Sequence, residues 1–198
     1  MVVMMNIMIV GVGGQGTLLA SRILGGVAIE QGYDVKVSEV HGMSQRGGSV
    51  VTYVKFGEFG EKVYSPIVGE KTADYIMAFE NLEAYRYLPY LKENGKLLVN
   101  AQEIDPMPVI LGSAKYPENI LTKIKDKNAS LCAVDAFSAA REAGSEKAVN
   151  VVLIGLLSAM MDISADVWRK VIQETVPPKF LEVNLKAFEL GRGLYKAA

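Results

Sequence analysis

Residues 6–16 read NIMIVGVGGQG, five mostly apolar residues followed by a turn that contains four glycines. The apolar run predicts a buried strand, and residues 17–31 carry apolar side chains four positions apart, as an amphipathic helix does. Glycines between a strand and a helix permit a tight turn and let backbone N–H groups approach a ligand. Because residues 34–40 form a second predicted strand, we expect a parallel strand pair with a right-handed crossover.

Strands and helices continue to alternate after this unit. We expect an antiparallel hairpin of residues 49–56 and 62–68. Further strands are predicted at residues 74–79, 96–100, 109–111 and 130–136. Helices are predicted at residues 81–93, with Asn81 as N-cap, and at 118–127, 137–161 with a break near Gly144, 166–175 and 181–195.

The order of these elements predicts an α/β fold. We expect a doubly wound, mostly parallel, Rossmann-like sheet with a β-hairpin insertion and a helical C-terminal third. The length of 198 residues fits one domain, with an α/β core at 1–136 and a helical extension at 137–198.

The composition excludes several functional classes. With 21 basic and 22 acidic residues, the net charge of −1 gives no electrostatic case for a nucleic-acid or membrane partner. A single cysteine excludes an internal disulfide and a cysteine-based zinc or iron–sulfur site within the chain. Residues 1–11 lack the basic region and cleavage site of a signal peptide, and the apolar stretch at 149–161 is shorter than the roughly 20 residues of a membrane span. We expect a cytoplasmic protein.

The glycine turn at residues 11–16 satisfies the pattern G-x-G-x-x-G, which is shared by dinucleotide sites and by ligand-free strand–helix junctions. Glu39, near the end of the second strand, lies where an acid accepts hydrogen bonds from the ribose of NAD. A P-loop is excluded, because Thr17 and Leu18 stand where Lys and Ser or Thr should follow the last glycine. An adenylating enzyme is disfavoured by the missing acidic residues after the second strand and by the lack of paired CxxC zinc ligands.

A second loop, HGMSQRGGS at residues 41–49, follows the second strand and should lie beside the glycine turn at the carboxyl edge of the sheet. Arg46 offers a guanidinium for a phosphate or carboxylate, and His41 can exchange a proton near neutral pH. The alternative is a structural loop whose polar groups satisfy one another or a partner chain. We interpret the loop as a binding or docking element.

The two loops together resemble a known family. The segments GVGGQGTLLASRIL at residues 11–24 and EVHGMSQRGGSV at 39–50 resemble the gamma-type subunit of 2-oxoacid:ferredoxin oxidoreductases, nearest to the indolepyruvate type. The resemblance continues through ENLEA at 80–84 and covers most of residues 6–160. It implies a complex that oxidatively decarboxylates a 2-oxo acid, yields an acyl-CoA and passes electrons to ferredoxin.

The resemblance also implies where the cofactors lie. Thiamine diphosphate with Mg²⁺ and the iron–sulfur clusters are expected in partner subunits, so this chain should be inactive alone and hold no tightly bound cofactor. We assign no catalytic residue and no metal ligand to it. Its expected role is to complete the active site on the side that accommodates coenzyme A, with Arg46 at the phosphates. The residues assigned to that surface are Gly11, Gly13, Gly14, Gln15, Gly16, His41, Ser44, Gln45, Arg46, Gly47, Gly48 and Ser49.

Two alternatives from other functional classes stay open on the sequence. A stand-alone NAD(P)- or nucleotide-binding protein would use the glycine turn and Glu39 and bind its nucleotide saturably as a purified chain. A regulatory or assembly module would bind a partner without any small ligand, and that binding would survive Arg46→Ala.

Overall fold

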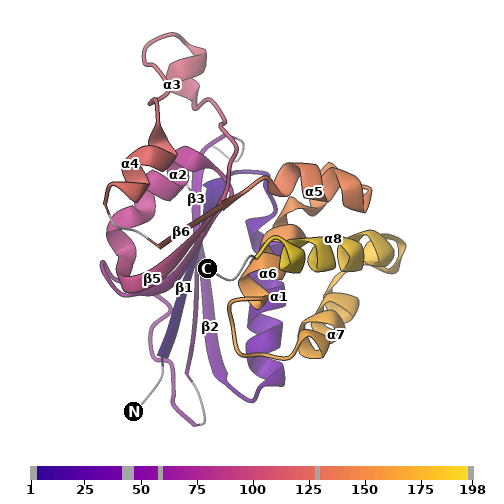
Figure 1. Cartoon of the computed structure of the whole chain (residues 1–198). Coiled ribbons are helices and arrows are strands. Elements are labelled where there is room, and N and C mark those ends of the chain that lie inside the picture. Colours follow the sequence, from indigo (N-terminus) through magenta and orange to yellow (C-terminus); the bar gives the residue numbers. More distant parts are fainter. Residues whose placement is uncertain (1–3, 42–46, 58–59, 128–129, 196–198) are drawn as a thin grey trace.

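The computed structural model describes residues 4–41, 47–57, 60–127 and 130–195. Within these ranges six strands form one sheet with helices on both faces (Figure 1). The strands are β1 (Met4–Val12), β2 (Asp34–His41), β3 (Ser49–Gly57), β4 (Ala73–Ala78), β5 (Leu91–Asn100) and β6 (Ser130–Val134). Their order is β2-β3-β1-β4-β5-β6, and neighbours are parallel except in the two pairs that include β3. The expected α/β fold with a doubly wound, mostly parallel sheet is confirmed.

Strand β3 lies between β1 and β2 and runs antiparallel to both. The expected direct pairing of residues 6–10 with 34–40 is therefore wrong: these strands point the same way, but β3 separates them. Val51, Val54 and Phe56 are all buried, and a strand buried on both faces belongs inside a sheet rather than in a peripheral hairpin.

The hairpin exists, but its two strands are β2 and β3. Residues 62–68, expected as the partner of 49–56, have no regular secondary structure. Pro66 explains part of this difference, since proline has no N–H to contribute to a strand ladder. The segment instead connects β3 to β4 along the amino-terminal edge of the sheet, where the Val63 N–H donates to the Asp34 carboxylate at 2.7 Å.

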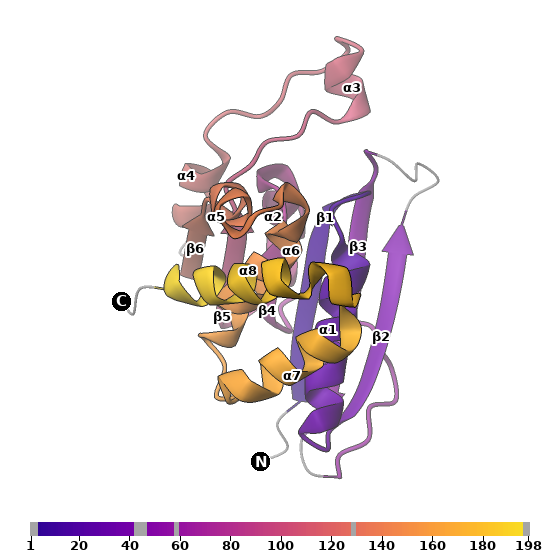
Figure 2. The same cartoon turned by 90° about the vertical axis from the view of Figure 1, so that its right-hand side faces the viewer.

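The helices form two layers, one on each face of the sheet (Figure 1), and Figure 2 looks onto the layer that contains α1, α7 and α8. One layer contains α1 (Thr17–Glu30), α5 (Ala136–Ala143), α6 (Val149–Ser158), α7 (Ala165–Thr175) and α8 (Leu181–Gly193). The other contains α2 (Asn81–Tyr87) and α4 (Ile120–Lys125), and the short α3 (Met107–Ile110) stands apart from both layers. Short 3-10 turns occupy Leu88–Tyr90, Glu146–Ala148 and Pro178–Phe180. The helical C-terminal third is confirmed.

Two predicted elements differ from the observed ones. The helix expected at 81–93 ends at Tyr87, because Pro89 has no N–H to continue the helical hydrogen bonds, and β5 begins at Leu91 rather than Lys96. In place of the strand expected at 109–111, Val109 and Ile110 form the end of the short helix α3, and Leu111 is its C-cap. Pro108 lies in the first turn of α3, a position that suits proline because the N–H groups there lack helical partners in any case.

Helix α6 is buried on all sides by this chain itself. Its ten residues are all buried, and α8 crosses it so closely that a Cβ on Gly191 would lie 2.0 Å from the Val152 carbonyl oxygen. The apolar stretch at 149–161 is thus explained by packing within the chain. Among the described residues, no helix combines the length and the apolar character that a membrane crossing requires.

Candidate functional site

The glycine turn lies at the carboxyl end of β1, next to the end of β4. The Gln15 side chain folds back between these strands: its Oε1 accepts from the Val12 N–H at 2.7 Å, and its Nε2 donates to the Phe79 carbonyl at 3.1 Å. Chain connections diverge to opposite sides of the sheet between β1 and β4, which is where doubly wound folds bind ligands. In this protein the Gln15 amide bridges that position from within the chain.

Gly11, Gly14 and Gly16 of the turn differ in how closely their neighbours pack against them. A Cβ on Gly11 would lie 2.8 Å from Gln15 Oε1, and a Cβ on Gly16 would lie 2.6 Å from Asn150 Nδ2, so a side chain at either position would displace the neighbouring amide group. Gly16 also has a φ of +84° and precedes α1. A Cβ on Gly14 would meet nothing within 4 Å, although its φ is +99°. Gly14 is therefore a position of this turn that stays open to a ligand.

The second loop is joined to the glycine turn by its described part. The Gly13 N–H donates to the Gly48 carbonyl at 2.9 Å, and Ser49 pairs with Val12 at the start of β3. Gly47, with a φ of +78°, is exposed. Ser44, Gln45 and Arg46 lie outside the described residues.

His41 and Glu39 lie at the end of β2. The His41 imidazole is 57% exposed, and its Nδ1 is 3.9 Å from Glu39 Oε1. Glu39 Oε2 accepts from the Thr52 hydroxyl at 3.0 Å and the Thr17 hydroxyl at 3.3 Å. One oxygen of the acid expected to contact a ribose thus holds β2 to β3 and to the start of α1.

Three hollows surround the glycine turn. One of about 380 Å³ lies between the turn and His41, and one of about 510 Å³ lies between the turn and Lys147. A third, of about 310 Å³, is lined by Gly47, Gly48 and Ser49 and by residues of α2 and α3. The expected site residues that the structure describes therefore share one edge of the sheet.

The first turn of α2 carries two buried carboxylates beside this edge. Glu80 is the N-cap, and its Oε2 accepts from the Glu83 N–H at 2.9 Å. Its Oε1 accepts from the Ile104 N–H at 3.2 Å and from the Tyr116 hydroxyl. Glu83 Oε2 accepts from the Ser49 hydroxyl at 2.5 Å. The N-cap expected at Asn81 is thus one residue earlier, and Glu83 connects α2 to the second loop.

Burial raises the pKa of the Glu83 carboxyl above its ordinary value. The hydrogen bond from Ser49 and the Arg86 guanidinium, 3.6 Å from Glu83 Oε1, oppose this rise, and the neighbouring Glu80 adds to it. Burial, and then the hydrogen bond to Glu80, raise the pKa of the Tyr116 phenol, so Tyr116 stays a proton donor at neutral pH.

Glu80 and Glu83 are not among the site residues predicted from the sequence. A usable signal was present: two acids three residues apart directly follow the buried run of β4, and that spacing matches an N-cap and the third helical residue. Their long-range partners Ser49 and Tyr116 had no comparable signal, because they are 34 and 36 residues away along the chain.

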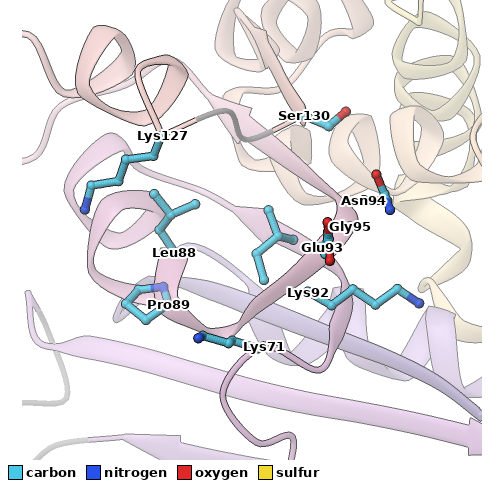
Figure 3. A pocket seen from close by; sticks show the side chains of 10 residues that line it. Lys71, Leu88, Pro89, Lys92, Glu93, Asn94, Gly95, Lys127 and Ser130 are labelled. Carbon is cyan, nitrogen blue, oxygen red and sulfur yellow. The ribbon is translucent and has the colours of Figure 1, made fainter.

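The hollow of about 890 Å³ at the opposite, amino-terminal edge is larger but lacks convergent groups. Lys71, Lys92 and Lys127 line it, yet Figure 3 shows Lys92 and Lys127 pointing to opposite sides. Lys92 is paired with Asp74, and Lys127 Nζ lies 4.9 Å from the centre of the Tyr85 ring. An anion there would not meet several cations at once, so we do not assign a site to this edge.

Comparison with known proteins identifies the family. The family model described as pyruvate ferredoxin/flavodoxin oxidoreductase matches residues 6–194. The chain belongs to this family. Indolepyruvate oxidoreductase subunit IorB of Pyrococcus horikoshii is 48% identical to it over 94% of this chain and 93% of that protein.

Two solved structures share the fold of this family member. The gamma subunit of a keto/oxoacid ferredoxin oxidoreductase from Geobacter sulfurreducens has a TM-score of 0.69 at 26% identity, over 96% of this chain and 97% of that one. The 2-oxoglutarate:ferredoxin oxidoreductase from Magnetococcus marinus, solved with 2-oxoglutarate, coenzyme A and succinyl-CoA bound, has a TM-score of 0.71 at 19% identity. This match covers 96% of the present chain and 31% of the Magnetococcus chain. The expected membership among gamma-type oxidoreductase subunits is confirmed.

Proposed function

We propose that the chain is the gamma-type subunit of an indolepyruvate:ferredoxin oxidoreductase. The complex would convert an aryl 2-oxo acid and coenzyme A to CO₂ and an acyl-CoA, with two electrons passed to ferredoxin. The 48% identity to the Pyrococcus subunit over nearly the full length of both chains supports the indolepyruvate type. We place this reaction in the cytoplasm.

The redox cofactors belong to partner subunits in this proposal. One cysteine in the whole sequence cannot supply the thiolates of an iron–sulfur cluster, and the described residues contain no group of three His, Cys, Asp or Glu placed to hold a metal. Thiamine diphosphate bound with Mg²⁺ by a partner would supply the nucleophile and electron sink for decarboxylation. This chain contributes a binding surface.

That surface is the carboxyl edge of the sheet. The observation that carries the proposal is the hydrogen bond from Gly13 to Gly48, which joins the glycine turn and the second loop into one edge bordered by three hollows. The open position at Gly14 suits close approach of an elongated ligand such as coenzyme A. Arg46, within the second loop, would pair with its phosphates, because a guanidinium binds phosphate oxygens bidentately.

Co-purification and kinetics of the reconstituted complex test this proposal. Affinity purification of the chain should also isolate a larger partner protein that carries thiamine diphosphate and iron–sulfur clusters. The pair should oxidise indolepyruvate faster than pyruvate, with ferredoxin as acceptor and with dependence on coenzyme A. Arg46→Ala should raise the KM for coenzyme A about tenfold, the loss of one charge-assisted contact. The matched control is Arg22→Ala, an exposed arginine of α1.

The opposite results are equally clear. A chain that recovers no such partner and binds NAD(H) saturably in calorimetry would support the stand-alone nucleotide-binding alternative. A complex whose KM for coenzyme A is the same in Arg46→Ala and Arg22→Ala would remove Arg46 from the binding surface.

A further inference from the structure

Residues 104–116, here called the arm, leave the sheet after β5 and return to the chain's main body before α4. They extend beyond the carboxyl edge of the sheet and carry α3 at their tip, apart from both helix layers (Figure 2). Glu80 holds the two ends of the arm together, because its Oε1 accepts from the Ile104 N–H at 3.2 Å and from the Tyr116 hydroxyl. The arm therefore has a fixed base on the first turn of α2.

The tip of the arm, residues 106–114, is a compact turn whose backbone groups bond to one another. The Pro108 carbonyl accepts from the Ser113 N–H at 2.9 Å, from the Ser113 hydroxyl at 3.0 Å and from the Ala114 N–H at 3.1 Å. Gly112, with a φ of +73°, follows α3 and turns the chain back. The tip is thus preformed and would lose little conformational entropy on binding a partner.

The side chains that the tip presents are apolar. Met107, Ile110 and Leu111 are 54%, 64% and 74% exposed, and their spacing of three and four residues places them on one side of α3. Residues 106–114 read PMPVILGSA and contain no charged side chain. A cluster of exposed apolar side chains on a preformed element is typical of a surface that another protein covers.

This apolar tip continues the surface proposed for coenzyme A. Residues 106–108 of the arm and residues 47–49 of the second loop line the same hollow of about 310 Å³. A partner that covers the tip therefore also approaches the end of the second loop.

Charged residues lie around the tip rather than on it. Glu103, Asp105 and Glu118 are exposed near the base of the arm, and Lys115 is the one basic residue in the stretch 103–118. The partner's matching recess should therefore be apolar inside and carry basic residues at its rim.

The size and shape of the tip favour a larger partner over a second copy of this chain. A contact between two tips would bury the side chains of two four-residue helices, far less than the roughly 800 Å² per partner of a stable interface. A projecting tip instead fits a recess in a larger body. In the Magnetococcus oxidoreductase this fold makes up only 31% of the chain, so there it is attached to a much larger polypeptide.

We propose that the tip of the arm is a docking element for the larger, thiamine-bearing subunit of the complex, and that Ile110 and Leu111 insert into an apolar recess of that subunit. This inference rests on the proposed function. It adds the surface by which the chain is held against the subunit whose active site it completes.

Calorimetric binding of the purified chain to the purified larger subunit tests the proposal. Ile110→Ser and Leu111→Ser should each raise the Kd at least about tenfold, and the double variant about a hundredfold, because each change removes an apolar side chain from the interface. Ile29→Ser is the matched control, since Ile29 of α1 is 63% exposed, close to the value for Ile110. Its Kd should equal that of the wild type.

Two results would overturn the proposal. One is a Kd for the double variant equal to that of Ile29→Ser, with the fold of both variants verified by circular dichroism. The other is a dimer of the chain alone, measured by light scattering, that Leu111→Ser dissociates and Ile29→Ser does not. That result would assign the tip to contact between two copies of this chain.

Failure of this inference is distinguishable from failure of the proposed function. If the wild-type complex oxidises indolepyruvate and the double variant binds the larger subunit as tightly as wild type, the docking role fails and the proposed function stands. If the double variant binds weakly but the wild-type complex does not oxidise indolepyruvate, the docking role stands and the proposed function fails. If the chain binds no thiamine-bearing subunit, both fall.

Discussion

The glycine turn and the first turn of α2 both border the second loop, yet they use their side chains differently. In the glycine turn, the side chains of Gln15 and Asn150 pack against Gly11 and Gly16, where a side chain would be in the way. The Gln15 amide also hydrogen-bonds to the backbone at the ends of β1 and β4. In the first turn of α2, two buried acids reach outward to distant segments. The conspicuous motif is thus largely internal packing, whereas the inconspicuous acids organise the edge around it.

The largest expected effect is a loss of stability when the buried acid Glu80 is removed from the first turn of α2. Glu80→Ala removes the acceptor for three donors, among them Ile104 and Tyr116, and should lower the free energy of unfolding by about 4 kcal/mol. Urea denaturation followed by circular dichroism measures the loss. Glu103→Ala, an exposed neighbour, is the control, and equal losses in the two variants would contradict the bracing role.

A smaller effect is expected where the glycine turn packs against α6. Gly16→Ala combines a strained positive φ with a contact against Asn150 and should cost about 3 kcal/mol. Gly14→Ala has the strain without the contact and should cost about 1 kcal/mol. Adding Asn150→Ala to Gly16→Ala should recover part of the loss, as a double-mutant cycle can measure. Equal costs at the two glycines would remove the distinction between the packed and the open position.

Gln15 provides the next test of the comparison. Gln15→Ala leaves the Val12 N–H and the Phe79 carbonyl without this partner, and we expect a loss of about 2 kcal/mol in thermal or urea unfolding. Gln173→Ala, exposed on α7, serves as control. A variant as stable as that control would show that the amide bridge between β1 and β4 contributes nothing.

The smallest effect concerns pH. Because the pKa of Glu83 is raised in the folded chain, the folded state binds more protons than the unfolded state between the ordinary carboxyl pKa and the raised one. Stabilisation by Glu83 is therefore present at low pH and lost as the pH rises through the raised value. Unfolding of Glu83→Gln, measured at several pH values, should show a smaller decrease over this window than wild type. An identical pH profile would mean that the ionisation of Glu83 does not influence folding.

Local sequence patterns predicted most of the individual helices and strands, but not which strands pair with each other. The alternation within residues 49–56 correctly indicated a strand, but the position of β3 between β1 and β2 depends on pairings with residues far along the chain. Residues 109–111 were expected to form a strand. None of the described strands pairs with them, and Val109 and Ile110 belong instead to a short helix that has Pro108 in its first turn.

The candidate site shows the same limit. The carboxyl-edge location of the glycine turn and of His41 followed from the common direction expected for the strands at residues 6–10 and 34–40. The hydrogen bonds between the Gln15 side chain and the backbone of Val12 and Phe79 could not be predicted from the sequence, because nothing in the sequence around a glutamine indicates which backbone groups its amide will contact.

The sequence by itself determined the strand–turn–helix unit at residues 6–31, the α/β class, the helical C-terminal third and, through its two loops, the family. These features arise from contacts within a few residues or from motifs that are contiguous in the chain. Only the tertiary structure decided that β3 lies inside the sheet, that Gly14 is an open position of the turn, and that Glu83 holds Ser49. Each of those depends on groups brought together by burial from distant parts of the chain, which no local pattern records.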